Sequence, residues 1–310
     1  MFFGTSAFAV PSLERLAASH AVVHCITQPD RPQGRGLARA PSPVKVAAQR
    51  LRLPLVQPAR LRAEDAAGVA ADIGVAAAYG QFIPKALLAL PAHGMLGVHP
   101  SLLPKYRGAA PVAWAIVNGE ATTGVTIFRM NERLDAGEVV AQEEVAIEPH
   151  EDAQQLTARL ARLGAEALLG ALERIAQGQA TFIPQDESRA IPAPKLTKAH
   201  GRIDWARPAE QIVRLVRATV PWPGAWTEWR GGLLKIWAAV ARAEPTAVAP
   251  GTVARAAGDA LAIAAGGDLV ELVEVQPAGR RRMRIQEFLA GHRIDVGERF
   301  GTGDRRQGAG

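Results

Sequence analysis

The 310-residue sequence contains a single cysteine, Cys25, which excludes an internal disulfide and any metal site built from clustered cysteines. No apolar run approaches the roughly 20 residues that a membrane-spanning helix needs. The N-terminus has no basic region followed by an apolar stretch, so we expect no signal peptide. These features favour a protein of the reducing cytoplasm with no membrane partner, and we expect it to be a monomer.

A dinucleotide-binding fingerprint is also missing. The early glycines Gly4, Gly34 and Gly36 do not form a G-x-G-x-x-G pattern after a strand. The chain is rich in apolar residues. Hydrophobic residues make up 48% of it, which is enough to bury a sizeable core. The formal net charge of +6 is a mild excess that favours a polyanionic partner.

Strand-like and helical patterns alternate over roughly the first 180 residues. Buried strands are predicted at residues 21–28, 72–80 and 124–130, where apolar and β-branched residues cluster. Helices are predicted at residues 42–52, with Ser42 as N-cap and Pro43 just inside, and at residues 151–178. This alternation predicts an α/β fold with a doubly wound, mostly parallel, Rossmann-like sheet.

The second part of the chain changes character after the proline-rich segment 184–196. A helix around residues 208–220 is followed by short apolar runs between glycines and prolines, which is typical of a small OB-like β-barrel. These runs lie at residues 232–240, 251–256, 260–265 and 269–276. We therefore predict a catalytic domain at residues 1–188, a linker at 189–205 and a C-terminal barrel at 206–310.

His99 stands out within the stretch GVHPSLLPKYRGAAP, which runs from Gly97 to Pro111. It follows a strand-like GMLGV and so falls at a strand's C-terminal end, where open α/β sheets place ligands. Pro100 and Pro104 restrict the surrounding backbone, and an imidazole exchanges a proton near neutral pH. A lone histidine is more often simply hydrogen-bonded in a turn, but this context favours a catalytic role.

Asp135, in RLDAGEVV, follows the strand predicted at residues 124–130. It is either an ordinary turn aspartate or a second strand-end group that faces His99, orients its ring and stabilises the protonated form. Ser101 is disfavoured as a nucleophile because no nucleophile-elbow sequence surrounds it. The apolar residues that follow it are either core or a wall for a flat ring, namely Leu102, Leu103 and Pro104.

Two basic clusters suggest contact with a phosphate backbone. The loop 28–43 is long, rich in glycine and proline, and carries Arg31, Arg35 and Arg39. A second cluster lies in the predicted barrel and consists of Arg280, Arg281, Arg282 and Arg284. Each is either a solvated surface or a nucleic-acid contact, and small β-barrels with basic loops often bind nucleic acid.

The stretch HPSLLPKYRGAAP followed by LDAGE resembles the folate-dependent formyltransferases, and TQPDRPQGRG, AAYGQFIP and APKLTKAHGRIDW extend the resemblance over nearly the whole chain. The resemblance implies transfer of the formyl group of 10-formyltetrahydrofolate to the α-amine of methionyl initiator tRNA for translation initiation. It also implies that the reaction uses neither a metal nor a covalent enzyme intermediate. His99 then shuttles the proton, and Asp135 tunes it.

The resemblance also implies binding residues. The folate site is expected at Tyr79, Gly80, Ile83, Ser101, Leu102, Leu103 and Pro104. The tRNA contacts are expected at Arg31, Arg35, Arg39, Lys45, Arg280, Arg281, Arg282 and Arg284.

Gly97 departs from the family pattern, which is Asn-x-His where this chain has Gly97-Val98-His99. Gly97 thus occupies a catalytic position without a side chain to polarise the formyl oxygen, and losing one such donor typically costs about 10²–10³ in rate. The chain is then a weakened or inactive binding protein, or water or a backbone N–H substitutes, or the asparagine contributes less than supposed. A sugar-nucleotide formyltransferase shares the catalytic region but is disfavoured by the basic loop and the barrel.

Overall fold

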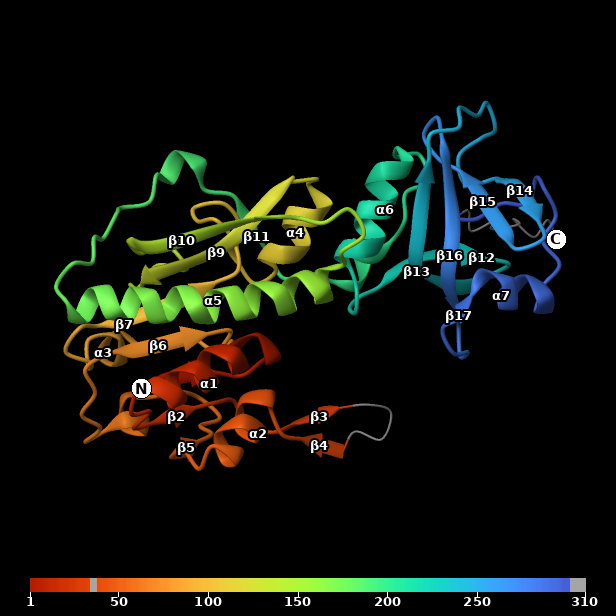
Figure 1. Ribbon diagram of the computed structural model, residues 1–310. Helices are drawn as coiled ribbons and strands as arrows, with labels where there is room; N and C mark the ends of the chain where they lie inside the picture. Colours follow the sequence, from red (N-terminus) through yellow and green to blue (C-terminus); the bar gives the residue numbers. More distant parts are fainter. Residues whose placement is uncertain (34–37, 302–310) are drawn as a thin grey trace, which may run out of the picture. The chain divides into compact units, whose positions relative to one another are not determined.

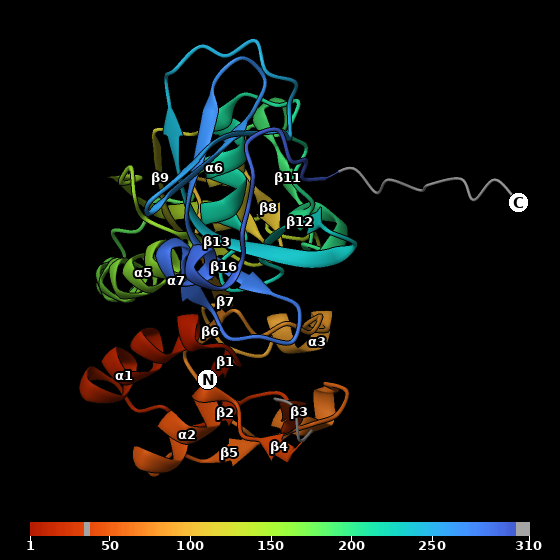
Figure 2. The same ribbon diagram turned by 90° about the vertical axis from the view of Figure 1, so that its right-hand side faces the viewer.

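A seven-stranded sheet organises the first unit of the chain in the computed structural model, which describes residues 1–33 and 38–301 (Figure 1). Its strands, in spatial order, are β10 (Val139–Ala146), β9 (Thr122–Arg129), β7 (Met95–His99), β6 (Gly74–Ala77), β1 (Phe2–Gly4), β2 (Cys25–Ile26) and β5 (Leu55–Val56). From β7 to β5 every pairing is parallel, and the labels follow one below another in Figure 2. Only β9 and β10 run antiparallel to their neighbours, so the mostly parallel sheet is confirmed.

Helices connect these strands. They are α1 (Val10–Ser19), α2 (Pro43–Arg50), α3 (Lys85–Leu88), α4 (Pro111–Val117) and α5 (Ala153–Ala176). The start of α2 is as predicted, because the Ser42 hydroxyl accepts a 3.0 Å hydrogen bond from the Lys45 amide and Pro43 opens the helix. No helix within residues 1–33 and 38–301 is long and apolar enough to cross a membrane.

Two predicted segments differ from the structure. The strand expected over residues 21–28 is only Cys25–Ile26, because its neighbours β1 and β5 offer no more than two pairing positions each. The region expected as a linker, 189–205, contains β11 (Pro192–Ala193), which pairs in parallel with β8 (Arg107–Gly108). The first unit therefore extends to Pro194, apart from residues 113–120 and 148–154, which belong to the second unit.

The central strand β7 is buried on both faces. Its residues Met95 to His99 are all buried. On one face lies α5, whose Gly164 approaches so closely that a Cβ there would stand 2.9 Å from the Cγ1 of Val98. Because side chains alternate along a strand, Gly97 and His99 point to the opposite face. The helix therefore supports the strand from one side while the other side remains for the site.

Cys25 lies in β2 with no exposed surface, and burial raises the pKa of its thiol to about 12. We expect the folded protein to react with a maleimide at pH 8 far more slowly than the urea-unfolded chain, because the thiolate is the reactive form. The alkylation rate, followed by mass spectrometry, checks this. Equal rates for the folded and unfolded chain would contradict the buried placement of β2.

The second unit is built on an antiparallel sheet, in the region where the sequence predicted a small OB-like β-barrel. Its order is β12 (Ala225–Trp229), β13 (Gly232–Arg242), β16 (Leu269–Pro277), β15 (Ala260–Ala264) and β14 (Val253–Ala257), and β17 (Met283–Arg284) pairs with β16. Irregular register bends β13 near Ala238. Helices α6 (Ala209–Ala218) and α7 (Ile285–Gly291) place Ile212 and Phe288 in the same core as these strands.

Candidate active site

His99 ends β7 at the C-terminal edge of the parallel strands, as predicted from the sequence, and is 6% exposed. Its Nε2 lies 2.9 Å from the carbonyl oxygen of Tyr106. A carbonyl oxygen only accepts, so Nε2 carries the hydrogen in this contact. The lone pair is then on Nδ1, which is therefore the atom that gains a proton.

Asp135 lies on the Nδ1 side of the ring, with its Oδ2 at 3.7 Å from that nitrogen. This separation exceeds a direct hydrogen bond but lies within ion-pair range of the ring when the ring is protonated. The same Oδ2 accepts a 2.9 Å hydrogen bond from the Gly108 amide. The structure thus brings the two candidate catalytic groups together from β7 and from the loop after β9. A carboxylate so placed stabilises an imidazolium.

The space beside Gly97 is filled by the ring of Phe128. The two residues are directly paired across β7 and β9. A Cβ added at position 97 would stand 2.5 Å from Cζ of that ring and closer still to Cε1. Phe128 is 3% exposed and lies on the same sheet face as His99, since Gly97 and His99 are two residues apart. Phe128 therefore occupies the volume that a side chain at Gly97 needs, which single-position sequence reasoning missed.

Ser101 is not a free nucleophile. It is fully buried, and its hydroxyl donates a 2.6 Å hydrogen bond to the carbonyl of Lys105. The next residues are held in place by Thr126, whose Oγ1 accepts a hydrogen bond from the Leu103 amide and donates to the Ser101 carbonyl. Leu102 and Pro104, three and five residues after His99, are half-buried, so part of their surface remains open.

The other expected folate residues are placed mainly in the core. Tyr79 and Ile83 belong to a buried apolar cluster, and burial raises the pKa of Tyr79 to about 12. The carbonyl of Tyr79 accepts a hydrogen bond from the amide side chain of Gln28. Gly80 has φ +79° and is exposed, and a Cβ there would meet Gln28 at 2.6 Å. Their backbone, rather than the tyrosine and isoleucine side chains, is what this edge of the sheet offers a ligand.

The basic loop rises from this edge as a hairpin of β3 (Arg31–Gln33) and β4 (Ala38–Ala40). Two of its expected tRNA contacts have partners at the base: Lys45 pairs with Asp30 at 2.7 Å, and Arg31 donates to the side-chain oxygen of Gln28. Arg39 is exposed. Arg35 lies outside the described residues.

The basic cluster of the second unit follows β16. Arg280, Arg281, Arg282 and Arg284 are all exposed. Arg281 pairs with Glu287 and Arg282 with Glu274, and exposed pairs of this kind are weak enough to exchange for phosphate. The Arg282 guanidinium also lies 5.4 Å from the centroid of the Trp237 ring, and the Lys235 amine lies 5.1 Å from it on β13. Lys235 and Trp237 were not included in the cluster predicted from the sequence. The one sequence signal for them is that they are two residues apart in a strand, which places both side chains on the same face.

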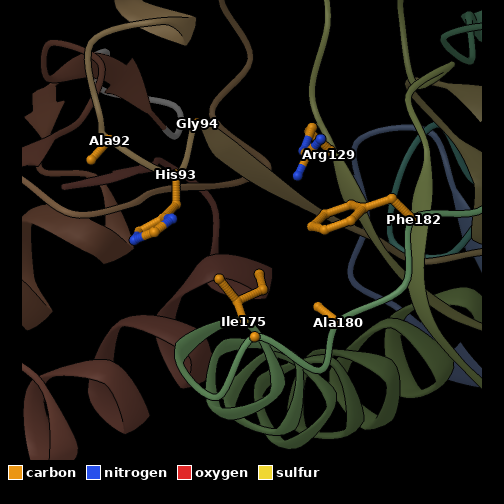
Figure 3. A pocket seen from close by; sticks show the side chains of 8 residues that line it. Ala92, His93, Gly94, Arg129, Ile175, Ala180 and Phe182 are labelled. Carbon is orange, nitrogen blue, oxygen red and sulfur yellow. The ribbon is translucent and has the colours of Figure 1, made fainter.

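A separate hollow of about 610 Å³ is shown in Figure 3. Its lining includes Gly94, which precedes β7, whereas His99 ends that strand. His93 and Ile175 line it, and Arg129 lies with its guanidinium 3.5 Å from the centroid of the Phe182 ring. Arg129 is also 3.4 Å from the carboxylate of Glu138. None of the candidate catalytic or folate residues lines this hollow, so it is distinct from the site at His99.

The matches to family models identify the chain as a formyl transferase. Residues 1–172 match the family described as formyl transferase, and residues 195–293 match its C-terminal domain. The sequence is 45% identical to the methionyl-tRNA formyltransferase of Roseiflexus sp. (strain RS-1), over 100% of this chain and 97% of that protein. The chain belongs to the methionyl-tRNA formyltransferase family of enzymes.

Further relatives agree with this placement. The methionyl-tRNA formyltransferase of Chloroflexus aurantiacus (strain ATCC 29366 / DSM 635 / J-10-fl) is 47% identical over 95% of this chain and 97% of its own length. Among solved structures, the N-formyltransferase from Helicobacter canadensis in complex with folinic acid and dTDP-3-aminofucose has a TM-score of 0.68. It covers 89% of this chain and 98% of its own, and at 16% identity it shows the fold alone.

Proposed function

We propose that the enzyme transfers the formyl group of 10-formyltetrahydrofolate to the α-amine of methionyl initiator tRNA, supplying formyl-methionyl-tRNA for translation initiation in the cytoplasm. The observation that carries the proposal is full-length similarity to methionyl-tRNA formyltransferases, joined with a histidine and a carboxylate at one sheet edge. The first unit, which ends at Pro194, would carry the chemistry, and the second unit would hold the tRNA.

The proton balance of this reaction assigns a role to His99. A bond forms between the amine nitrogen and the formyl carbon, and the bond from that carbon to the folate nitrogen breaks. The amine loses one proton and the folate nitrogen gains one, so a single positioned base can shuttle it. Nδ1 of His99 takes the proton while Asp135 stabilises the imidazolium, and the ring then returns it to the leaving nitrogen.

The folate site is proposed beside this pair. Leu102 and Pro104 offer apolar surface to a flat ring, and the exposed backbone at Gly80 offers polar groups from the next strand. The remaining expected residues are buried and would support the loops that form the site rather than contact the ligand. They are Tyr79, Ile83, Ser101 and Leu103. Proton transfer between the amine and the folate nitrogen through His99 requires no metal.

The proposed tRNA surface combines positive charge with an aromatic platform. On the second unit, the cationic groups of Lys235 and Arg282 lie 5.1 and 5.4 Å from the centroid of the half-buried Trp237 ring, and the exposed Arg280 and Arg284 are near Arg282 in sequence. Phosphate contacts to arginine and base stacking on the accessible part of an aromatic ring are usual means of binding RNA. On the first unit Arg31 and Arg39 of the loop are both exposed. Arg31 also donates to Gln28, and Lys45 pairs with Asp30 at the base of the loop.

A single-turnover assay with saturating substrates tests the proposal. The protein is mixed with 10-formyltetrahydrofolate and either initiator methionyl-tRNA or a dTDP-linked amino sugar, and formyl transfer is followed by mass spectrometry. We expect transfer to the methionyl-tRNA only. Transfer to the sugar alone would identify a sugar formyltransferase, and tight tRNA binding without transfer would identify a binding protein.

A further inference from the structure

The segment after α5 returns to the catalytic edge of the first unit. Val139 and Ile183 exchange backbone hydrogen bonds of 2.8 and 2.9 Å, which tie the start of the segment to β10. Further on, the Arg107 amide donates to the Ile191 carbonyl as β11 pairs with β8. The segment between these two attachments carries Gln185 across the loop that holds Asp135.

Gln185 makes four side-chain hydrogen bonds there. Its amide nitrogen donates to the carbonyl oxygens of Asp135 at 2.9 Å and Gly137 at 2.7 Å. Its amide oxygen accepts from Arg107, from Nε at 3.0 Å and Nη2 at 2.7 Å. Carbonyls only accept and guanidinium groups only donate, so the amide has one possible orientation.

The loop that Gln185 holds is conformationally demanding. Asp135 has φ +48°, a left-handed conformation that few side-chain-bearing residues adopt. Two residues later, a Cβ at Gly137 would overlap the Arg129 carbonyl oxygen, so the chain is tightly packed on β9. Strained backbone persists only where its surroundings fix it. Gln185 binds the carbonyl of the strained residue itself.

Arg107 is in turn held by Glu187, with guanidinium-to-carboxylate distances of 3.0 Å for both nitrogens. Arg133 donates to the same carboxylate at 2.7 Å. Hydrogen bonds from Arg107 and then Arg133 lower the pKa of Glu187 to about 2. The carboxylate is therefore ionised at any pH suitable for an assay. It holds Arg107, which in turn holds the amide oxygen of Gln185.

We propose that Gln185 is a positioning residue for formyl transfer: it fixes the strained Asp135 loop so that the carboxylate faces Nδ1 of His99. The proposal rests on the proposed function, because it assumes that His99 carries the proton. Gln185 itself touches neither substrate in this arrangement and acts through Asp135.

The test compares Gln185→Glu with the natural protein. The glutamate keeps acceptor oxygens for Arg107 but sets an oxygen against the two carbonyls that the amide nitrogen bound. We expect kcat to fall by about 10- to 100-fold, as for small displacements of a catalytic group, while KM for both substrates changes less than about threefold. In the uncharged variant Gln185→Met, the midpoint of the acid limb of the kcat–pH profile should move to lower pH, because a displaced carboxylate stabilises the imidazolium less.

A matched control is Gln177→Glu, at an exposed residue just after α5 whose side-chain amide donates to Glu173, and this variant should behave as the natural protein. Gln185→Met, which keeps the length without hydrogen bonds, serves if the glutamate variant does not fold. An unchanged pH midpoint, or a rise in KM equal to the loss in kcat, overturns the proposal. Failure of the natural protein itself to transfer formyl groups would instead overturn the proposed function.

Discussion

Replacing His99 with alanine is expected to slow formyl transfer by about 10²–10⁴-fold, the range of a general acid–base group. The loss should fall on kcat, because the imidazole is placed to move a proton and the neighbouring Leu102 and Pro104 surface remains. The natural enzyme's acid limb in the pH–rate profile should vanish in the variant. Single-turnover rates between about pH 5.5 and 8.5, the range in which a histidine titrates, measure both effects.

His99→Gln separates proton transfer from support of the loop. Its amide nitrogen can still donate to the Tyr106 carbonyl, which accepts from Nε2 of His99 at 2.9 Å in the natural protein. An amide cannot take up a proton in this range, so the glutamine variant should be as slow as the alanine variant but fold more stably. A glutamine variant that keeps more than about a third of the natural rate would remove His99 from the proton path, since general acid–base loss is far larger.

Gly97→Asn alone is expected to destabilise the protein by about 1–3 kcal/mol, the usual cost of overpacking a buried site. The new Cβ would overlap the Phe128 ring, so ring, strand or both must move. We expect no gain in the formylation rate, because the amide cannot reach its place while the ring fills it. Urea unfolding and single-turnover rates of the variant provide the measurements.

The paired change Gly97→Asn with Phe128→Leu should behave differently. Leucine lacks the two ring atoms nearest to position 97, Cε1 and Cζ, so the asparagine gains room. We expect the double variant to transfer formyl groups about 10²–10³-fold faster than the Gly97→Asn single variant, as for restoring one oxyanion donor. Phe128→Leu alone is the control and should gain no rate. A double variant no faster than the natural enzyme would show that another group holds the oxyanion.

Much of the fold was predictable because it depends on local pattern. Two helices were predicted close to their observed ends. The signals were the cap at Ser42 with the proline after it for α2, and the apolar face for α5. Apolar runs between glycines and prolines likewise predicted β13 to β16 of the second unit. The length of β2 was not predictable, because a strand extends only as far as its partners and β5 is two residues long.

The candidate catalytic residues were predictable only where each could be recognised from its own stretch of sequence. His99 and Asp135 each follow a predicted strand, so their shared edge could be inferred. Phe128 and Gln185 were missed because their importance lies in pairings with residues 31 positions away and 48 to 78 positions away, respectively. Cross-strand register and long-range side-chain contacts leave no periodic signal in one sequence.

Gly164 lies on α5, away from His99, yet a side chain at this position would affect how His99 is placed. A methyl group there would press on Val98, whose neighbours in the strand are Gly97 and His99. Because the three residues are consecutive in one strand, we expect a push on Val98 from the helix side to shift the backbone that carries the imidazole. Alanine at this position would make α5 more stable as a helix. Substitution there is nevertheless limited, because proton transfer tolerates only small displacements of the imidazole.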